Sequence, residues 1–142
     1  MSVLQPNVIG TSHDNTIRGI LFLIIIPLIL AGINDYLRIK ELGSFDNNYP
    51  REQSAKLTGL GARAWAAQQN SWEALIMYVP SVLVAHVVGA DPVQSSYAAI
   101  LFCTARVVHA GCYLLNIATL RSLSYFVTLG CCFWLFWLAS NV

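Results

Sequence analysis

The chain has 142 residues, of which 56% are apolar and only 11% are charged, and its mean hydropathy is +0.59. An ordinary soluble domain carries about 25% charged residues, and a small domain keeps much of its surface in water. These values exclude a soluble globular domain and a disordered chain. A net charge of +1 without a basic run excludes a nucleic-acid-binding protein.

Long segments with few charged residues predict four membrane-spanning helices, at about 17–37, 62–88, 92–116 and 121–141. A helix needs roughly 20 mostly apolar residues to cross a bilayer. The third span is continuous only if Arg106 lies inside the membrane. A cleavable signal peptide is a less favoured interpretation of the first span, because a mostly polar stretch precedes it. The sequence therefore predicts an all-α, multi-pass membrane protein with a single four-helix domain, in a bacterial inner membrane or a eukaryotic endomembrane.

Basic residues concentrate between the first and second spans and at the adjoining helix ends. They are Arg38, Lys40, Arg51, Lys56 and Arg63. The turn at 89–91 has no basic residue, so the positive-inside rule places the basic segment in the cytoplasm and both termini on the non-cytoplasmic side. Residues 40–58 are predicted to form a loop, because turn-forming residues are frequent there and the residue before Pro50 disfavours helix.

All of the cysteines, Cys103, Cys112, Cys131 and Cys132, fall within predicted spans. Free cysteine is a small apolar residue that is often buried, and these four show no metal-ligand spacing. The sequence therefore predicts that they are core positions, and it predicts no metal site.

Polar residues of the second and third spans fall at one depth, in the cytoplasmic half of the bilayer. Counting about 1.5 Å per residue places Glu73 and Arg106 level with each other, where we expect an ion pair. Two helix faces carry such groups, one with Arg63, Asn70 and Glu73 and the other with Arg106, His109 and Tyr113. An alternative is a purely structural ion pair that fixes the register of the helices.

Arg121 and Ser122 open the fourth span at the same level, and Arg38 closes the first. Because arginine binds carboxylates in a bidentate manner, this arrangement predicts a site for a small anionic, water-soluble ligand, with an apolar partner arriving from the lipid. Two simpler interpretations stay open. His109 would be a hydrogen-bonded interior histidine, and Arg121 an anchor at the membrane surface.

Several segments resemble the MAPEG family, the membrane-associated proteins of eicosanoid and glutathione metabolism. Residues 63–73 (RAWAAQQNSWE) are similar to the signature of the family's second span. Residues 106–113 (RVVHAGCY) and 121–125 (RSLSY) are similar to its third and fourth spans. Arg38 and the residues after it resemble the family's basic exit from the first span.

This resemblance implies a homotrimer of four-helix protomers, with glutathione bound between neighbouring protomers near the cytoplasmic side. Residues at matching positions would line or support the glutathione site. They are Arg38, Arg63, Asn70, Glu73, Arg106, His109, Tyr113, Arg121 and Tyr125. The resemblance further implies that Arg121 stabilises the glutathione thiolate, and that Tyr113 or Ser122 donates a hydrogen bond to the sulfur.

The expected function is that of a glutathione-dependent membrane transferase or peroxidase acting on hydrophobic electrophiles or lipid hydroperoxides. The alternative is a non-catalytic accessory or scaffold subunit of a larger membrane complex, because Ala66 stands where the family carries an arginine and Gln69 where its prostaglandin E synthase branch carries another. Aromatic residues of the last span, such as Trp134 and Trp137, would then pack against lipid, pigment or protein. A transporter is the least favoured interpretation, since the spans contain no broken-helix pair and no acidic relay.

Overall fold

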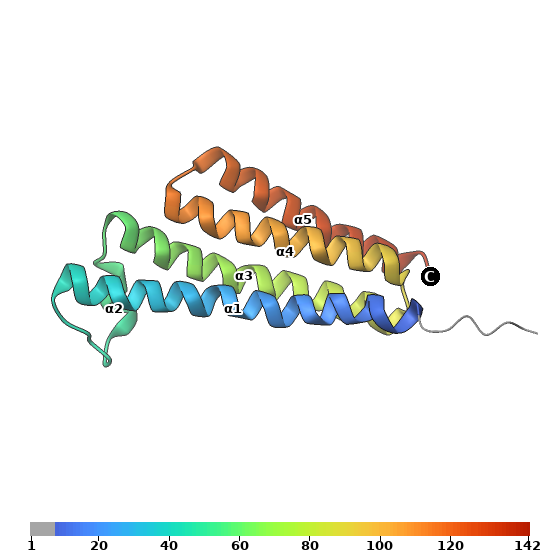
Figure 1. Cartoon of the computed structure of the whole chain (residues 1–142), viewed down its shortest axis with the longest axis horizontal. Coiled ribbons are helices and arrows are strands. Elements are labelled where there is room, and N and C mark those ends of the chain that lie inside the picture. The colour runs from blue at the N-terminus through green and yellow to red at the C-terminus, as the bar shows by residue number, and fades with distance from the viewer. Residues whose placement is uncertain (1–7) are drawn as a thin grey trace, which may run out of the picture.

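Long helices dominate the part of the chain that the structure describes (Figure 1). The structure is a computed structural model, and it describes the backbone of residues 8–142 and the side chains from residue 15 onward. Its elements are α1 (Val8–Leu42), α2 (Pro50–Ala55), α3 (Gly59–Val88), α4 (Pro92–Leu115) and α5 (Ala118–Ser140). No strand occurs within residues 8–142.

All four predicted membrane spans are present. The helical stretches long and apolar enough to cross a bilayer are Asn15–Leu42, Gly59–Val88, Pro92–Leu115 and Ala118–Ser140. The prediction of an all-α protein with four membrane spans is therefore confirmed. The first span runs past its expected end at residue 37, because charged side chains do not interrupt the backbone hydrogen bonds of a helix. It ends before Gly43, whose φ of +74° is a left-handed conformation that favours glycine.

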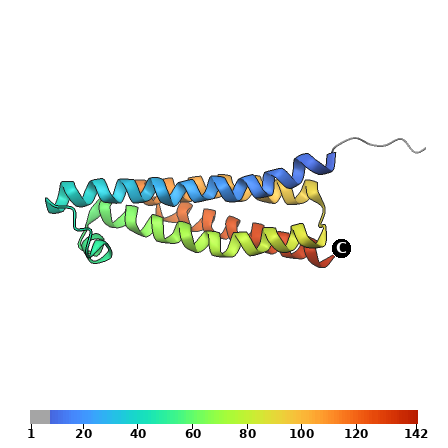
Figure 2. The ribbon, with the colours of Figure 1, turned by 90° about the horizontal axis from the view of Figure 1, so that it is seen from below.

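The four long helices lie side by side as a bundle, with each helix antiparallel to the next along the chain (Figures 1 and 2). α1 packs against α3 and α4, and α5 packs against the same two helices from the other side. α2 lies at one end of the bundle, while the start of α1 and the C-terminus lie at the opposite end (Figure 1). The basic segment therefore lies at the end of the bundle opposite to the start of α1 and the C-terminus.

The core of the bundle is apolar and tightly packed. Tyr78 of α3 and Phe102 of α4 are fully buried, and their rings stack with centroids 4.2 Å apart. Leu135 of α5 is also fully buried in this core. All four cysteines are free, with Cys112, Cys131 and Cys132 buried and Cys103 partly buried, in agreement with the prediction of core positions.

The segment between α1 and α3 differs from the predicted loop, because residues 50–55 form helix α2. Pro50 occupies the first turn of this helix, where its missing N–H group costs no hydrogen bond. Tyr49, which precedes the proline, has φ −127° and ψ 58° and so lies outside the α region that the following proline disfavours. A helix of six residues is unstable on its own, so the buried Gln53 and Ser54 identify tertiary contact as its stabilising force.

Gly19 of α1 lies where this helix closely approaches α3 and α4. A Cβ atom there would lie 2.8 Å from the hydroxyl oxygen of Tyr78 and 3.3 Å from the sulfur of Cys103. We therefore expect Gly19→Ala to lower the thermal midpoint of the detergent-solubilised protein, because Tyr78 is fully buried and has no room to move. The matched control is Gly32→Ala, whose Cβ would meet no atom within 4 Å and should stabilise the helix by up to about 1 kcal/mol. An equal rise of the midpoint in both variants would contradict this explanation.

Candidate functional site

A polar cavity opens between α3, α4 and α5. It consists of two hollows of about 300 and 200 Å³ that share Asn70 and Tyr125 as walls. Glu73 and Arg106 also line the larger hollow. His109, Tyr113, Arg121 and Ser122 also line the smaller one. The structure therefore brings together the predicted site residues of α3, α4 and α5, except Arg63.

Arg106 of α4 is the largest fully buried side chain and is only 2% exposed. Its Nη2 donates hydrogen bonds to the backbone oxygen of Asn70 at 3.2 Å and to the Oδ1 of the same residue at 3.0 Å. Asn70 in turn donates from Nδ2 to Glu73 Oε2 at 3.1 Å. The expected direct ion pair between Glu73 and Arg106 is therefore not formed, because Asn70 lies between them. Glu73 keeps an exposed carboxylate, which avoids the cost of burying a second charge.

His109 connects α4 to the first turn of α5. Its Nδ1 lies 3.0 Å from the backbone oxygen of Arg121 and 3.1 Å from the hydroxyl oxygen of Ser124. A carbonyl oxygen only accepts hydrogen bonds, so the short distance to Arg121 assigns the proton to Nδ1. Nε2 is buried and has no hydrogen-bond partner. His109 is thus a hydrogen-bonded interior histidine that holds the turn carrying Arg121, and it leaves one acceptor nitrogen unused.

Arg121 lies at the start of α5 and meets an aromatic face instead of an acid. Its guanidinium carbon is 4.5 Å from the centroid of the Tyr113 ring, a cation–π arrangement. No described carboxylate forms an ion pair with Arg121 within 4 Å, so none of the described acidic side chains neutralises it. Ser122 is exposed beside it and donates to the backbone oxygen of Ala118 at 3.2 Å. Arg121 therefore offers an uncompensated positive charge at the wall of the polar cavity.

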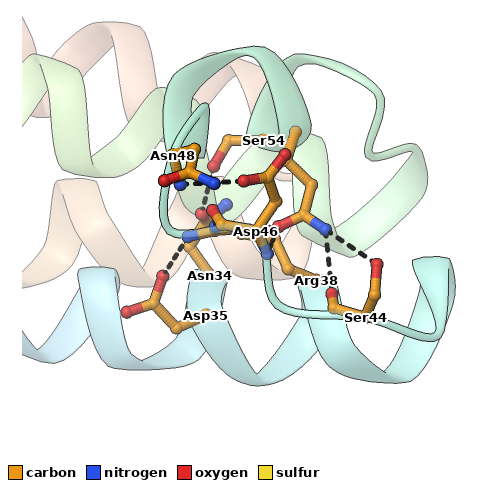
Figure 3. A network of polar contacts seen from close by, with 8 residues as sticks. Asn34, Asp35, Arg38, Ser44, Asp46, Asn48 and Ser54 are labelled. Carbon is orange, nitrogen blue, oxygen red and sulfur yellow. Dashed lines mark hydrogen bonds and ion pairs between the residues drawn. The ribbon is translucent and has the colours of Figure 1, made fainter.

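Arg38 lies apart from this cavity, in a polar network that joins α1 to the segment carrying α2 (Figure 3). It is 3% exposed and donates from Nε to Gln53 Oε1 at 2.7 Å, from Nη1 to Asp35 Oδ1 at 2.8 Å, and from Nη2 to the backbone oxygen of Asp46 at 2.6 Å. The ring of Phe45 covers its guanidinium at 4.5 Å. Arg38 lines a separate hollow of about 330 Å³ between α1, α2 and α3.

Arg63 is also separate from the polar cavity, although it shares a helix face with Asn70 in the sequence. Its Nη2 donates to the backbone oxygen of Leu114 at 3.5 Å, near the end of α4. A cation near the carboxyl end of a helix is favourable because the backbone oxygens there carry partial negative charge. Its Nε is buried without a hydrogen-bond partner. Arg63 therefore caps α4 and does not line the polar cavity.

Comparison with known proteins agrees with this architecture. The profile of the MAPEG family matches residues 18–141, nearly the whole chain. The chain belongs to the MAPEG family. No curated protein matches it individually. Membership, together with the four spans, makes it a multi-pass integral membrane protein of a family associated with glutathione and eicosanoid metabolism.

In this MAPEG protein, several contacts around the predicted site residues come from side chains that the sequence motifs did not identify. Ser124, one turn after Arg121, donates to the Arg121 backbone oxygen at 2.8 Å beside His109. Asp35 pairs with Arg38 at the i,i+3 spacing, a signal that the sequence did contain. Gln53 gave no such signal, because its contact with Arg38 depends on α2 folding back onto α1.

Proposed function

We propose that this protein is a glutathione-dependent membrane transferase or peroxidase acting on hydrophobic electrophiles or lipid hydroperoxides. The observation that carries the proposal is Arg121, a cation with no carboxylate partner among the described side chains, stacked on Tyr113 at the wall of the polar cavity. A thiol has an ordinary pKa of about 8.5, and a nearby positive charge lowers it. At neutral pH, Arg121 would therefore increase the fraction of nucleophilic thiolate.

The remaining residues of the polar cavity suit the other groups of glutathione, which has an ammonium group and two carboxylates. Glu73 offers an exposed carboxylate for the ammonium, and Arg106 supplies a cation at the wall beside Asn70. Tyr113, Ser122 and Tyr125 add hydroxyl groups around the same cavity. His109 offers its unused Nε2 as a buried hydrogen-bond acceptor. This donor and acceptor set fits a zwitterionic, acidic thiol better than an apolar ligand alone.

The proposal includes a homotrimer in which neighbouring protomers share each glutathione site. Arg38 lines a hollow between α1, α2 and α3, whereas the polar cavity lies between α3, α4 and α5. If the Arg38 hollow of one protomer faced the polar cavity of the next, Arg38 and the residues of the polar cavity would surround one ligand. The proposal also places the α2 end of the bundle in the cytoplasm and both termini on the other side, because the basic residues gather at the α2 end.

Titration of the detergent-purified protein with glutathione, followed by thiolate absorbance, tests the function directly. We expect a saturable thiolate signal at neutral pH in the natural protein. Arg121→Leu should abolish this signal and lower turnover of a model electrophile by about a hundredfold or more, the effect of losing a group that stabilises developing anionic charge. Arg121→Lys is the matched control, because it retains the charge and should retain part of the signal.

The same titration distinguishes the proposed enzyme function from the alternative of a non-catalytic accessory subunit. Absence of a thiolate signal from a folded, oligomeric natural protein would overturn the proposed enzyme function. Copurification of a stable protein partner would then favour the accessory role. An unchanged signal in Arg121→Leu would leave glutathione as the ligand but remove Arg121 from the catalytic role.

A further inference from the structure

Ser124 lies near the start of α5, behind the wall of the polar cavity. Its neighbours Arg121, Ser122 and Tyr125 line the cavity, whereas Ser124 is 5% exposed and lines neither of the two hollows. A ligand in the cavity would therefore not touch the Ser124 hydroxyl. The hydroxyl instead contacts groups of the protein itself, at the junction between α4 and α5.

The Ser124 hydroxyl closes a triangle of hydrogen bonds with His109 and Arg121. Its Oγ donates to the backbone oxygen of Arg121 at 2.8 Å. A hydroxyl has one proton to donate, so the same Oγ accepts from His109 Nδ1 at 3.1 Å, while Nδ1 also donates to the Arg121 oxygen at 3.0 Å. Ser124 is therefore one of two acceptors that keep the proton on Nδ1 and fix the orientation of the His109 ring.

The His109 ring supports the aromatic ring on which Arg121 stacks. The rings of His109 and Tyr113 meet edge to face, with their centroids 5.3 Å apart. The guanidinium carbon of Arg121 lies 4.5 Å from the centroid of the Tyr113 ring. His109 thus holds Arg121 in two ways, through the backbone oxygen and through Tyr113. A rotation of the His109 ring would change both contacts and would move the Arg121 cation relative to the cavity.

We propose that Ser124 is a positioning residue that acts through His109 to fix the distance between the Arg121 guanidinium and the glutathione sulfur; this role rests on the glutathione-dependent function proposed above. The attraction between a cation and a thiolate falls with distance. Separating the two charges from about 4 to about 5 Å, at an effective dielectric constant of about 20, lowers the acid dissociation constant of the thiol about fourfold. Ser124 therefore acts on the fraction of thiolate and not on affinity, because Glu73 and Arg106 lie in the larger hollow, away from this triangle.

Thiolate absorbance of the full-length protein in detergent, followed against pH at saturating glutathione, tests this role. We expect Ser124→Ala to lower the acid dissociation constant of the bound thiol about fourfold, which raises its apparent pKa, and to leave the dissociation constant of glutathione unchanged. Ser124→Thr keeps the hydroxyl and should restore the natural pH profile. Thr128→Val is the matched control, because the buried Thr128 hydroxyl also bonds to a backbone oxygen of α5, that of Tyr125 at 2.7 Å, without involving His109. It should leave the pH profile unchanged.

The possible results separate the role of Ser124 from the proposed function. An unchanged pH profile in Ser124→Ala would overturn the role of Ser124, while the thiolate signal of the natural protein would still support the function. Equal shifts in Ser124→Ala and Thr128→Val would also overturn it, because they would indicate a general loosening of α5. Absence of a thiolate signal from the natural protein would overturn the function, and the role of Ser124 with it.

Nitrogen-15 NMR of the histidine-labelled protein in detergent gives a second measurement, which decides the question if Ser124→Ala fails to fold. We expect the His109 signals, assigned by their absence from His109→Gln, to show a proton on Nδ1 and none on Nε2. This measurement needs no glutathione. A proton on Nε2 in the natural protein would overturn the proposal, because Nδ1 could then not donate to Ser124.

Discussion

Arg106→Leu should weaken glutathione binding by about a hundredfold while the four spans stay folded. Arg106 is 2% exposed, and its Nη2 hydrogen bonds to Asn70 are 3.2 and 3.0 Å long. The substitution removes the cation from the larger hollow and leaves Asn70 without its donor. Truncating one partner of a buried, hydrogen-bonded charge costs about 2–5 kcal/mol, and a hundredfold change corresponds to about 2.7 kcal/mol. Isothermal titration calorimetry with glutathione in detergent measures this change.

Glu73→Gln is the matched variant for this experiment. Its side-chain oxygen still accepts the hydrogen bond from Asn70 Nδ2, so the connection between Asn70 and position 73 is retained while the negative charge is lost. We expect weaker binding than in the natural protein, because the ligand's ammonium group loses its partner, but a smaller effect than in Arg106→Leu. Unchanged glutathione affinity in Arg106→Leu would contradict the role given to Arg106.

The spans were predictable from the sequence because the bilayer imposes a simple requirement on it. A spanning helix needs a long apolar run, and segments with few charged residues mark the four spans even though Glu73 and Arg106 lie inside two of them. The grouping of Asn70, Glu73 and Arg106 was predictable for the same reason, since helical rise converts residue number into depth. The depth of these residues in the bilayer did not identify which of their side-chain atoms form hydrogen bonds. Asn70 reaches the guanidinium and displaces Glu73, a result that depends on side-chain length and rotation about the helix axis.

Contacts of the short segment after α1 were the least predictable. The sequence contains turn-forming residues and Pro50 in this segment. A proline disfavours helix at the residue before it but is compatible with a helix that begins at the proline itself. Whether α2 forms depends on burial of Gln53 and Ser54, a tertiary effect that no local pattern contains. The position of Arg38 depends on the same folding event, because its Nε bonds to Gln53. The sequence therefore identified Arg38 as important without identifying its partners.

Arg38→Leu should destabilise the segment between α1 and α3 by about 3 kcal/mol, because each hydrogen bond to a charged group contributes about 1.5–3 kcal/mol and the oxygens of Gln53 and Asp46 would lose this donor. The substitution removes the hydrogen bonds to Gln53, Asp35 and the backbone of Asp46, together with the contact with Phe45. Limited proteolysis should then cut within residues 43–57 at rates that leave the natural protein intact. The four spans should keep their helical circular dichroism, because this network lies around α2, at one end of the bundle (Figure 1).

Two further variants separate this positioning role from direct ligand binding. Gln53→Leu keeps the charge of Arg38 but removes the acceptor for its Nε and for the Asp46 N–H group, so it should increase proteolysis as well. Lys40→Leu removes an exposed charge two residues away and should change neither proteolysis nor stability. If Arg38→Leu weakened glutathione binding while residues 43–57 stayed resistant to protease, Arg38 would act on the ligand and not on the segment. Three hydrogen bonds and the Phe45 ring surround the guanidinium of Arg38. We therefore expect Arg38→Leu to increase proteolysis of residues 43–57 and not to weaken glutathione binding alone.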